Sequence, residues 1–86
     1  MSDTIDLAPY PVGATVLRPR DPRQRKFRFH ALMIHPDLLA GWSLQRDWGR
    51  IGSPGRVAIT AFPDRDHALV EAERYAARKR RKGYQG

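Results

Sequence analysis

Three stretches in the middle of the chain alternate apolar and polar residues with a period of two, which is the pattern of half-buried strands. They cover residues 27–35, 42–48 and 57–62, and the turn-forming residues between them keep the connections short. Short connections favour antiparallel pairing of neighbouring strands in a meander. One face of the first stretch becomes apolar toward its end, at Leu32 and Ile34, so we expect both faces of that strand to be covered there.

The pattern changes to that of a helix after Pro63. We expect Asp64 to cap the helix N-terminus, Asp66 to add negative charge to the first turn, and Gly83 to end the helix. The apolar residues between these ends form one stripe: Ala68, Leu69, Ala72, Tyr75 and Ala76. The predicted fold is therefore α+β, a small antiparallel β-sheet of about four strands with one C-terminal α-helix packed on one face.

The length of 86 residues allows one domain. Residues 1–13 are predicted to form a flexible N-terminal arm, and residues 14–86 a single domain that opens with a short edge strand at 14–17. No apolar run approaches the roughly 20 residues of a membrane span, and the first residues lack the basic and apolar segments of a secretory signal. Because the sequence also has no cysteine, we expect a cytoplasmic protein that does not engage a membrane.

The charge of the chain indicates that this small domain has a binding partner. The chain has 16 Lys and Arg against 9 Asp and Glu, a net charge of +7. The bases gather in two clusters: residues 18–28 hold six bases and one acid, and residues 74–82 hold six bases and no acid. Most are arginine, whose planar fork suits phosphate, so the charge favours an anionic partner.

A glycine-rich turn follows the second alternating stretch. Residues 49–55 contain three glycines and a proline, which indicate a tight turn or bulge. The stretch Trp48-Gly49-Arg50-Ile51-Gly52-Ser53-Pro54-Gly55 resembles the motif of the WGR domain family. The resemblance continues in Trp42-Ser43-Leu44 before the motif, in the helix near Ala68 and in Lys79-Arg80-Arg81-Lys82-Gly83-Tyr84, and it covers roughly residues 23–85.

This resemblance implies both a fold and a function. The family occurs as a module of eukaryotic poly(ADP-ribose) polymerases and as short bacterial proteins, with an antiparallel sheet plus a helix. In the polymerases the motif tryptophan packs on the sugar-phosphate end of DNA and the motif arginine links to neighbouring domains, roles that fall on Trp48 and Arg50. The polymerase catalytic domain has no counterpart in this chain. Two departures are Arg56, where the family usually has glutamine, and His30, where it often has tyrosine.

We therefore predict a non-catalytic module that binds nucleic acid, DNA more than RNA, through contacts to the backbone or to strand ends. The predicted contact residues combine the motif with the two basic clusters: Trp48, Arg50, Arg56, Arg25, Lys26, Arg28, Arg78, Lys79, Arg81 and Lys82. One alternative is a protein–protein adaptor, which family precedent for Arg50 and the apolar second face of residues 27–35 would support. A structural alternative is that Trp48 caps the core, Arg50 braces the turn and the clusters are solvated surface.

The sequence gives little support for catalysis, a metal or a cofactor. The three histidines, His30, His35 and His67, fall on different predicted elements, and a zinc site needs three or four ligands at suitable spacing. Ser43 and Ser53 have no general base nearby in sequence. We expect no enzymatic activity, no metal and no cofactor.

Overall fold

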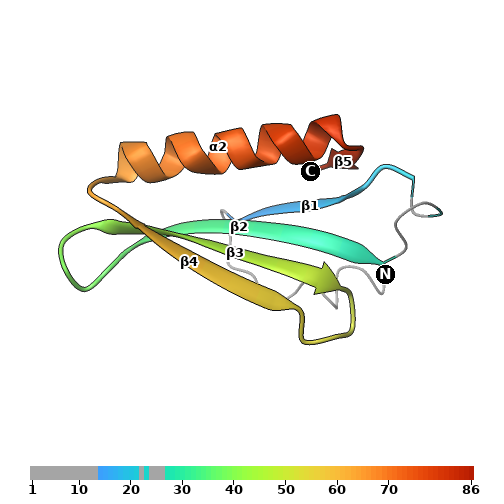
Figure 1. Cartoon of the computed structure of the whole chain (residues 1–86), viewed down its shortest axis with the longest axis horizontal. Coiled ribbons are helices and arrows are strands. Elements are labelled where there is room, and N and C mark those ends of the chain that lie inside the picture. The colour runs from blue at the N-terminus through green and yellow to red at the C-terminus, as the bar shows by residue number, and fades with distance from the viewer. Residues whose placement is uncertain (1–13, 22, 24–26) are drawn as a thin grey trace.

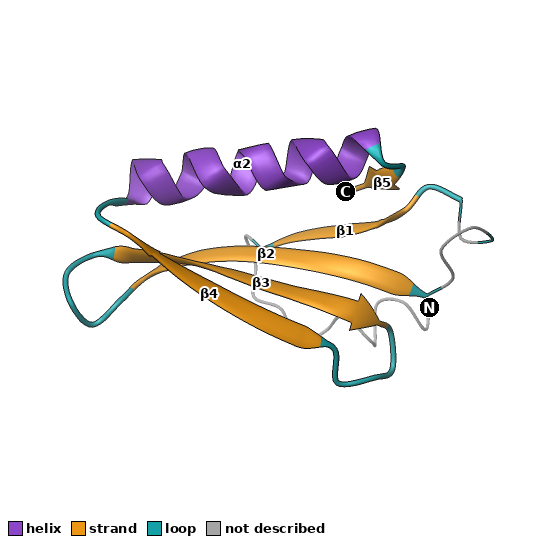
Figure 2. Ribbon diagram, viewed as in Figure 1, coloured by secondary structure: helices purple, strands orange, loops and turns teal. Residues whose placement is uncertain are grey.

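The computed structural model describes residues 14–21, 23 and 27–86, and these form one sheet and one helix (Figure 1). The elements in chain order are β1 (Thr15–Pro19), β2 (Arg28–Pro36), β3 (Trp42–Arg50), β4 (Arg56–Phe62), α2 (Arg65–Arg81) and β5 (Tyr84–Gln85). The strand order is β4-β3-β2-β1-β5 and every neighbouring pair is antiparallel. Helix α2 covers one face of the sheet (Figure 2), so the predicted α+β class is confirmed.

The register of the central strands explains why the helix packs where it does. Leu32 of β2 lies opposite Arg46 of β3, and Ile34 lies opposite Leu44. Directly opposite residues share a face of the sheet, so the alternation in both strands lines up on the side of α2. Leu32 and Leu44 are buried there, and each buried leucine contributes about 1.5–3 kcal/mol of apolar burial.

The helix ends match the sequence prediction. Asp64 has an extended backbone and its side chain accepts a hydrogen bond from the backbone N–H of His67 at 2.9 Å. At the other end, Lys82 is the C-cap and Gly83 adopts a φ of +102°, a conformation that favours glycine. Ala68, Tyr75 and Ala76 of the predicted stripe are buried, and Ala72 packs partly buried against the core.

The structure refines the predicted sheet and corrects one expectation about it. The sheet has five strands where about four were predicted, because the chain turns back at Gly83 and adds the two-residue strand β5. Strand β1 is not an edge strand, since Arg18 pairs with Gln85 and Pro19 with Tyr84. A strand of two residues is too short to show an alternating pattern, so its pairing arises only when the helix brings the C-terminal residues beside β1.

The core lies between α2 and the sheet, and Tyr84 of β5 closes it together with Leu17 of β1. The predicted arm, residues 1–13, lies outside the described residues. In the part of the chain that the structure describes, no helix is both long and apolar enough to span a bilayer.

Candidate nucleic-acid interface

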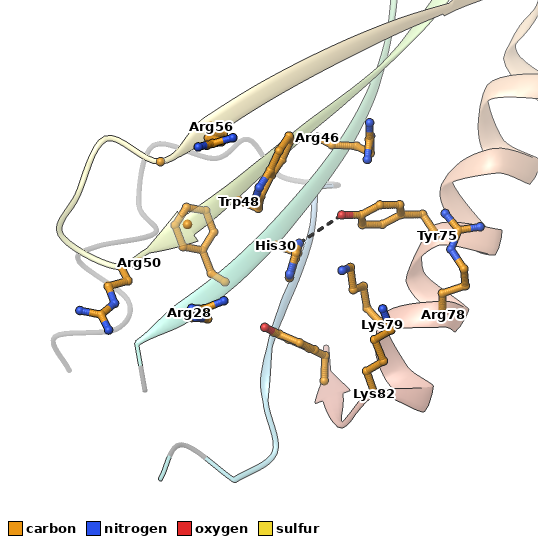
Figure 3. Close-up of a pocket in the computed structure, with 14 residues that line it drawn as sticks. Arg28, His30, Arg46, Trp48, Arg50, Arg56, Tyr75, Arg78, Lys79 and Lys82 are labelled. Atoms are coloured by element: carbon orange, nitrogen blue, oxygen red, sulfur yellow. Dashed lines mark hydrogen bonds between the residues drawn. The ribbon is translucent and has the colours of Figure 1, made fainter. Parts of the chain in front are cut away.

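A pocket of about 1030 Å³ opens where the C-terminal half of α2 approaches the strands next to the β3–β4 turn (Figure 3). Strands β2, β3 and β4, helix α2 and β5 all contribute to its wall. The lining residues are Arg28, Phe29, His30, Arg46, Trp48, Gly49, Arg50, Gly55, Arg56, Tyr75, Arg78, Lys79, Lys82 and Tyr84. Residues of the WGR-like motif and bases from both basic clusters of the sequence therefore line the same pocket.

The pocket is strongly cationic. Seven of its described lining residues are arginine or lysine, and no described lining residue is aspartate or glutamate. The seven are Arg28, Arg46, Arg50, Arg56, Arg78, Lys79 and Lys82. Arg28 comes from the first basic cluster and Arg78, Lys79 and Lys82 from the second, so the fold brings parts of both clusters together. Cations of one sign gathered in a concave site raise the local concentration of anions.

The ring of Tyr75 organises three of these cations. The Arg46 guanidinium carbon lies 4.9 Å from the ring centroid, the Lys79 Nζ 5.3 Å and the Arg78 guanidinium carbon 5.4 Å. An aromatic face attracts a cation without neutralising it. Tyr75 therefore positions these three cations at the pocket wall without adding negative charge to it.

A buried histidine, His30, contacts the hydroxyl group of Tyr75. The Tyr75 hydroxyl and the His30 Nδ1 lie 3.2 Å apart, within hydrogen-bond distance, and both side chains are buried. The His30 ring also meets the Tyr84 ring edge-on, with 4.9 Å between centroids. His30, where the family often has tyrosine, thus forms part of the aromatic floor of the pocket.

Trp48 lies on the helix-facing side of β3, opposite His30 on β2. It is half-buried, and the Arg46 guanidinium carbon lies 5.6 Å from the centroid of its ring system. Part of the ring remains open to the pocket, so the side chain does more than close the core. An amphipathic ring held beside several cations can pack on a sugar or a base while the cations meet phosphate.

Arg50 differs from the other pocket cations. It is exposed at the end of β3 and its side chain points away from α2 (Figure 3). Its backbone carbonyl accepts hydrogen bonds from the Ser53 N–H at 3.1 Å and from the Ser53 Oγ at 2.9 Å. The backbone of Arg50 therefore braces the turn, while its guanidinium reaches outward at the rim of the pocket.

Glycines let the two arms of this turn approach closely. A Cβ on Gly49 would lie 2.7 Å from the Gly55 Cα, and a Cβ on Gly55 would lie 2.7 Å from the Trp48 carbonyl oxygen. Gly55 also has a φ of +69°. The predicted tight turn is therefore present, and its glycines bring Arg56 of β4 alongside Trp48.

Of the remaining predicted contact residues, the structure describes only Arg81. Arg81 is exposed and does not line the pocket. Arg25 and Lys26 lie outside the described residues. Sequence reasoning missed Arg46 and Tyr75: the alternation placed Arg46 on the face of Trp48, and the helix stripe contained Tyr75, but neither pattern showed that the two side chains meet. Among the described residues, no group of three His, Cys, Asp or Glu side chains could hold a metal ion.

The profile of the WGR domain matches residues 14–86, which include the turn, the cationic pocket and the helix. The chain belongs to the WGR domain family. WGR domains are a known type of nucleic-acid-binding module.

One relative of this WGR domain comes from Sinorhizobium fredii (strain NBRC 101917 / NGR234) and is described as uncharacterized protein y4dW. The two are 33% identical over 64 residues, which cover 74% of this chain and 31% of the relative. The matched part of the chain thus spans about a third of the length of that protein. No solved structure matches the chain significantly.

Proposed function

We propose that this WGR domain is a non-catalytic module that binds nucleic acid, DNA more than RNA, in the cationic pocket. The observation that carries the proposal is the convergence of seven cations from three strands and the helix on one pocket that, among its described lining residues, has no carboxylate. Phosphate contacts supply essentially all of the affinity of non-specific nucleic-acid binding. A cytoplasmic location stays a prediction from the sequence.

The positions of the side chains in the pocket suggest a different binding role for each group of them. The exposed bases at the rim, Arg28, Arg56 and Lys82, neutralise phosphates. Trp48, in the wall, packs on a sugar or a terminal base. Arg46 and Tyr75 hold this arrangement in place before the ligand arrives, which lowers the cost of ordering side chains on binding. Contacts of this kind position a strand without reading base edges, so binding is directed by backbone and structure.

A titration with fluorescently labelled DNA tests the proposal. Duplex, nicked duplex and single-stranded DNA, with an RNA duplex for comparison, are titrated at two salt concentrations by anisotropy. We expect binding at low salt that weakens steeply as salt rises. Binding no tighter than about 10⁻⁴ M at low salt, the weak end of non-specific association, would overturn the proposal.

The alternative of a protein–protein adaptor loses one of its supports. Leu32 and Ile34, which make the second face of β2 apolar, pack in the core under α2 and are not an exposed surface. A protein partner stays a prediction that rests on family precedent for Arg50. Recovery of a specific protein in a pull-down after nuclease treatment, combined with absent DNA binding, would favour it.

A further inference from the structure

Strand β4 forms one edge of the sheet, and in the described part of the chain it pairs with β3 alone (Figure 1). The opposite edge, β5, has only two residues, and the Arg80 guanidinium donates a hydrogen bond at 2.8 Å to the carbonyl of Gly86 beside it. Strand β4 has seven residues, and residues 57–62 contain no charge and no proline, which are common protections of an edge strand. Its backbone is therefore a template for a further strand.

The side chains of β4 that point away from α2 are apolar and exposed. Thr60 lies opposite Leu44, which packs under α2, so the odd-numbered residues of β4 lie on the other face of the sheet. Val57 is 57% exposed, Ile59 is 62% exposed and Ala61 is also exposed. These three side chains form a contiguous apolar stripe along the open edge, which indicates an interaction surface.

The sequence of β4 is complementary to itself in the antiparallel direction. A twofold axis at Ile59 pairs all seven residues of the strand with the same seven residues of a second copy, and any other centre pairs fewer of them. Ile59 then lies opposite Ile59, and Val57 lies opposite Ala61. Because directly opposite residues share a face of a sheet, the two apolar stripes join into one.

The charges around the strand suit the same pairing. The chain has a net charge of +7, so two copies repel each other, and an uncharged strand is where they can meet. Antiparallel order places the two Arg56 residues about 20 Å apart along the strands, beyond the Debye length of about 8 Å at physiological salt. Each Arg56 lies instead opposite Phe62 of the other copy, two residues before the exposed acid Asp64.

We propose that β4 is a self-association surface, at which two copies of this chain pair their β4 strands antiparallel about Ile59. The result is one continuous sheet with five strands from each copy. The twofold axis is normal to this sheet, so both cationic pockets lie on the same face and one nucleic acid can contact both. That consequence rests on the proposed function, whereas the pairing does not. A single pair of strands is small beside a standard interface, so we expect association in the upper micromolar range.

Single cysteines test the register, because the chain has no cysteine of its own. In Ile59→Cys the two thiols lie directly opposite, with Cα atoms about 4.5–5.5 Å apart, a separation that allows a disulfide. The matched control is Val57→Cys, on the same face and similarly exposed. Its two thiols are four residues apart along the strands, about 14 Å, which is too far for a disulfide.

We expect mild oxidation to convert Ile59→Cys into a covalent dimer and to leave Val57→Cys largely monomeric. Equal cross-linking of the two variants would indicate random collision and would overturn the register. No cross-linking of Ile59→Cys, or more cross-linking of Val57→Cys, would overturn it as well.

Two charged variants at the same position test association without a covalent bond. Ile59→Lys alone, and Ile59→Glu alone, place like charges directly opposite each other, which is destabilising. In sedimentation velocity at rising concentration, we expect a growing dimer fraction for the wild type and monomer for each variant alone. An equal mixture of the two variants places lysine opposite glutamate and should restore the dimer. Thermal unfolding checks that both variants are folded, as expected at an exposed position.

A monomeric wild type in the upper micromolar range would overturn the proposal, and so would single variants that associate as the wild type does. A mixture that stays monomeric would overturn the pairing at Ile59. Neither experiment contains DNA, so a failure of self-association leaves the proposed function standing. Absent DNA binding with intact cross-linking of Ile59→Cys would leave the β4 pairing standing and remove the proposed function.

Discussion

Two arginines on the same helix offer a sharp test of whether the cationic pocket is the binding site. Arg78 and Arg81 both lie in the last turns of α2 and both are exposed. Arg78 lines the pocket and its guanidinium carbon lies 5.4 Å from the centroid of the Tyr75 ring, whereas Arg81 is not in the lining. Arg78→Ala and Arg81→Ala change net charge and helix propensity equally. The two variants therefore differ in whether the lost side chain lines the pocket.

The expected difference follows from counterion release. Each phosphate that a protein cation neutralises adds about 0.9 to the slope of log affinity against log salt concentration. Arg78→Ala should therefore make this slope shallower by about 0.9, and Arg81→Ala should leave it unchanged. Between about 50 mM and about 200 mM salt, one such contact corresponds to a factor of about 3.5 in affinity. The gap between wild type and Arg78→Ala should narrow by that factor over this range.

Fluorescence anisotropy with one labelled duplex at four or more salt concentrations measures the slopes. Thermal unfolding of both variants checks that the helix is intact, since alanine is a good helix former at both positions. Equal slopes for the two variants, whether both are reduced or both unchanged, would refute the assignment of binding to the pocket. A reduction in Arg81→Ala alone would place the phosphates on the outer side of α2.

Three further predictions concern the fold that builds the pocket. Gly52→Ala, at a φ of +89° with open space around it, should cost about 1–2 kcal/mol in urea unfolding, and Gly55→Ala should cost more because its Cβ meets backbone at 2.7 Å. The hydrogen bonds that Asp64 accepts from the backbone and side chain of His67 lower the pKa of Asp64. Its contribution to stability is therefore full above the ordinary aspartate pKa of about 3.9 and is lost as pH falls through the lowered pKa, which unfolding curves in acid measure. Leu44→Ala should lower the free energy of unfolding by about 2–5 kcal/mol, because Leu44 is 1% exposed.

Each of these has a control that can contradict it. Equal losses for the two glycine variants would show that the close approach does not constrain the turn. Asp64→Asn keeps the capping oxygen but cannot titrate, so it should remove this part of the acid dependence, and an unchanged acid limb would contradict the assignment. Ile59→Ala, at a position 62% exposed, should cost within about 0.5 kcal/mol, and a loss as large as that of Leu44→Ala would contradict the location of the core.

Local patterns in the sequence were sufficient for the three central strands and the helix of this domain. The period of two placed the central strands, and the period of 3.6 together with Asp64 and Gly83 placed the helix and its ends. The glycines of the motif predicted the turn, because positive φ and close backbone approach are local requirements. The same motif indicated the WGR family, which the profile match confirms.

The tertiary structure alone decided which side chains meet. Periodicity assigns a residue to a face of its own strand or helix, but the contact between Arg46 and Tyr75 depends on where α2 crosses the sheet. For the same reason the sequence could not show that Arg28 and Arg78 share a pocket while Arg81 lies outside it. Contacts between residues far apart in the chain arise from packing the core, so the charge clusters were visible in the sequence and the pocket was not.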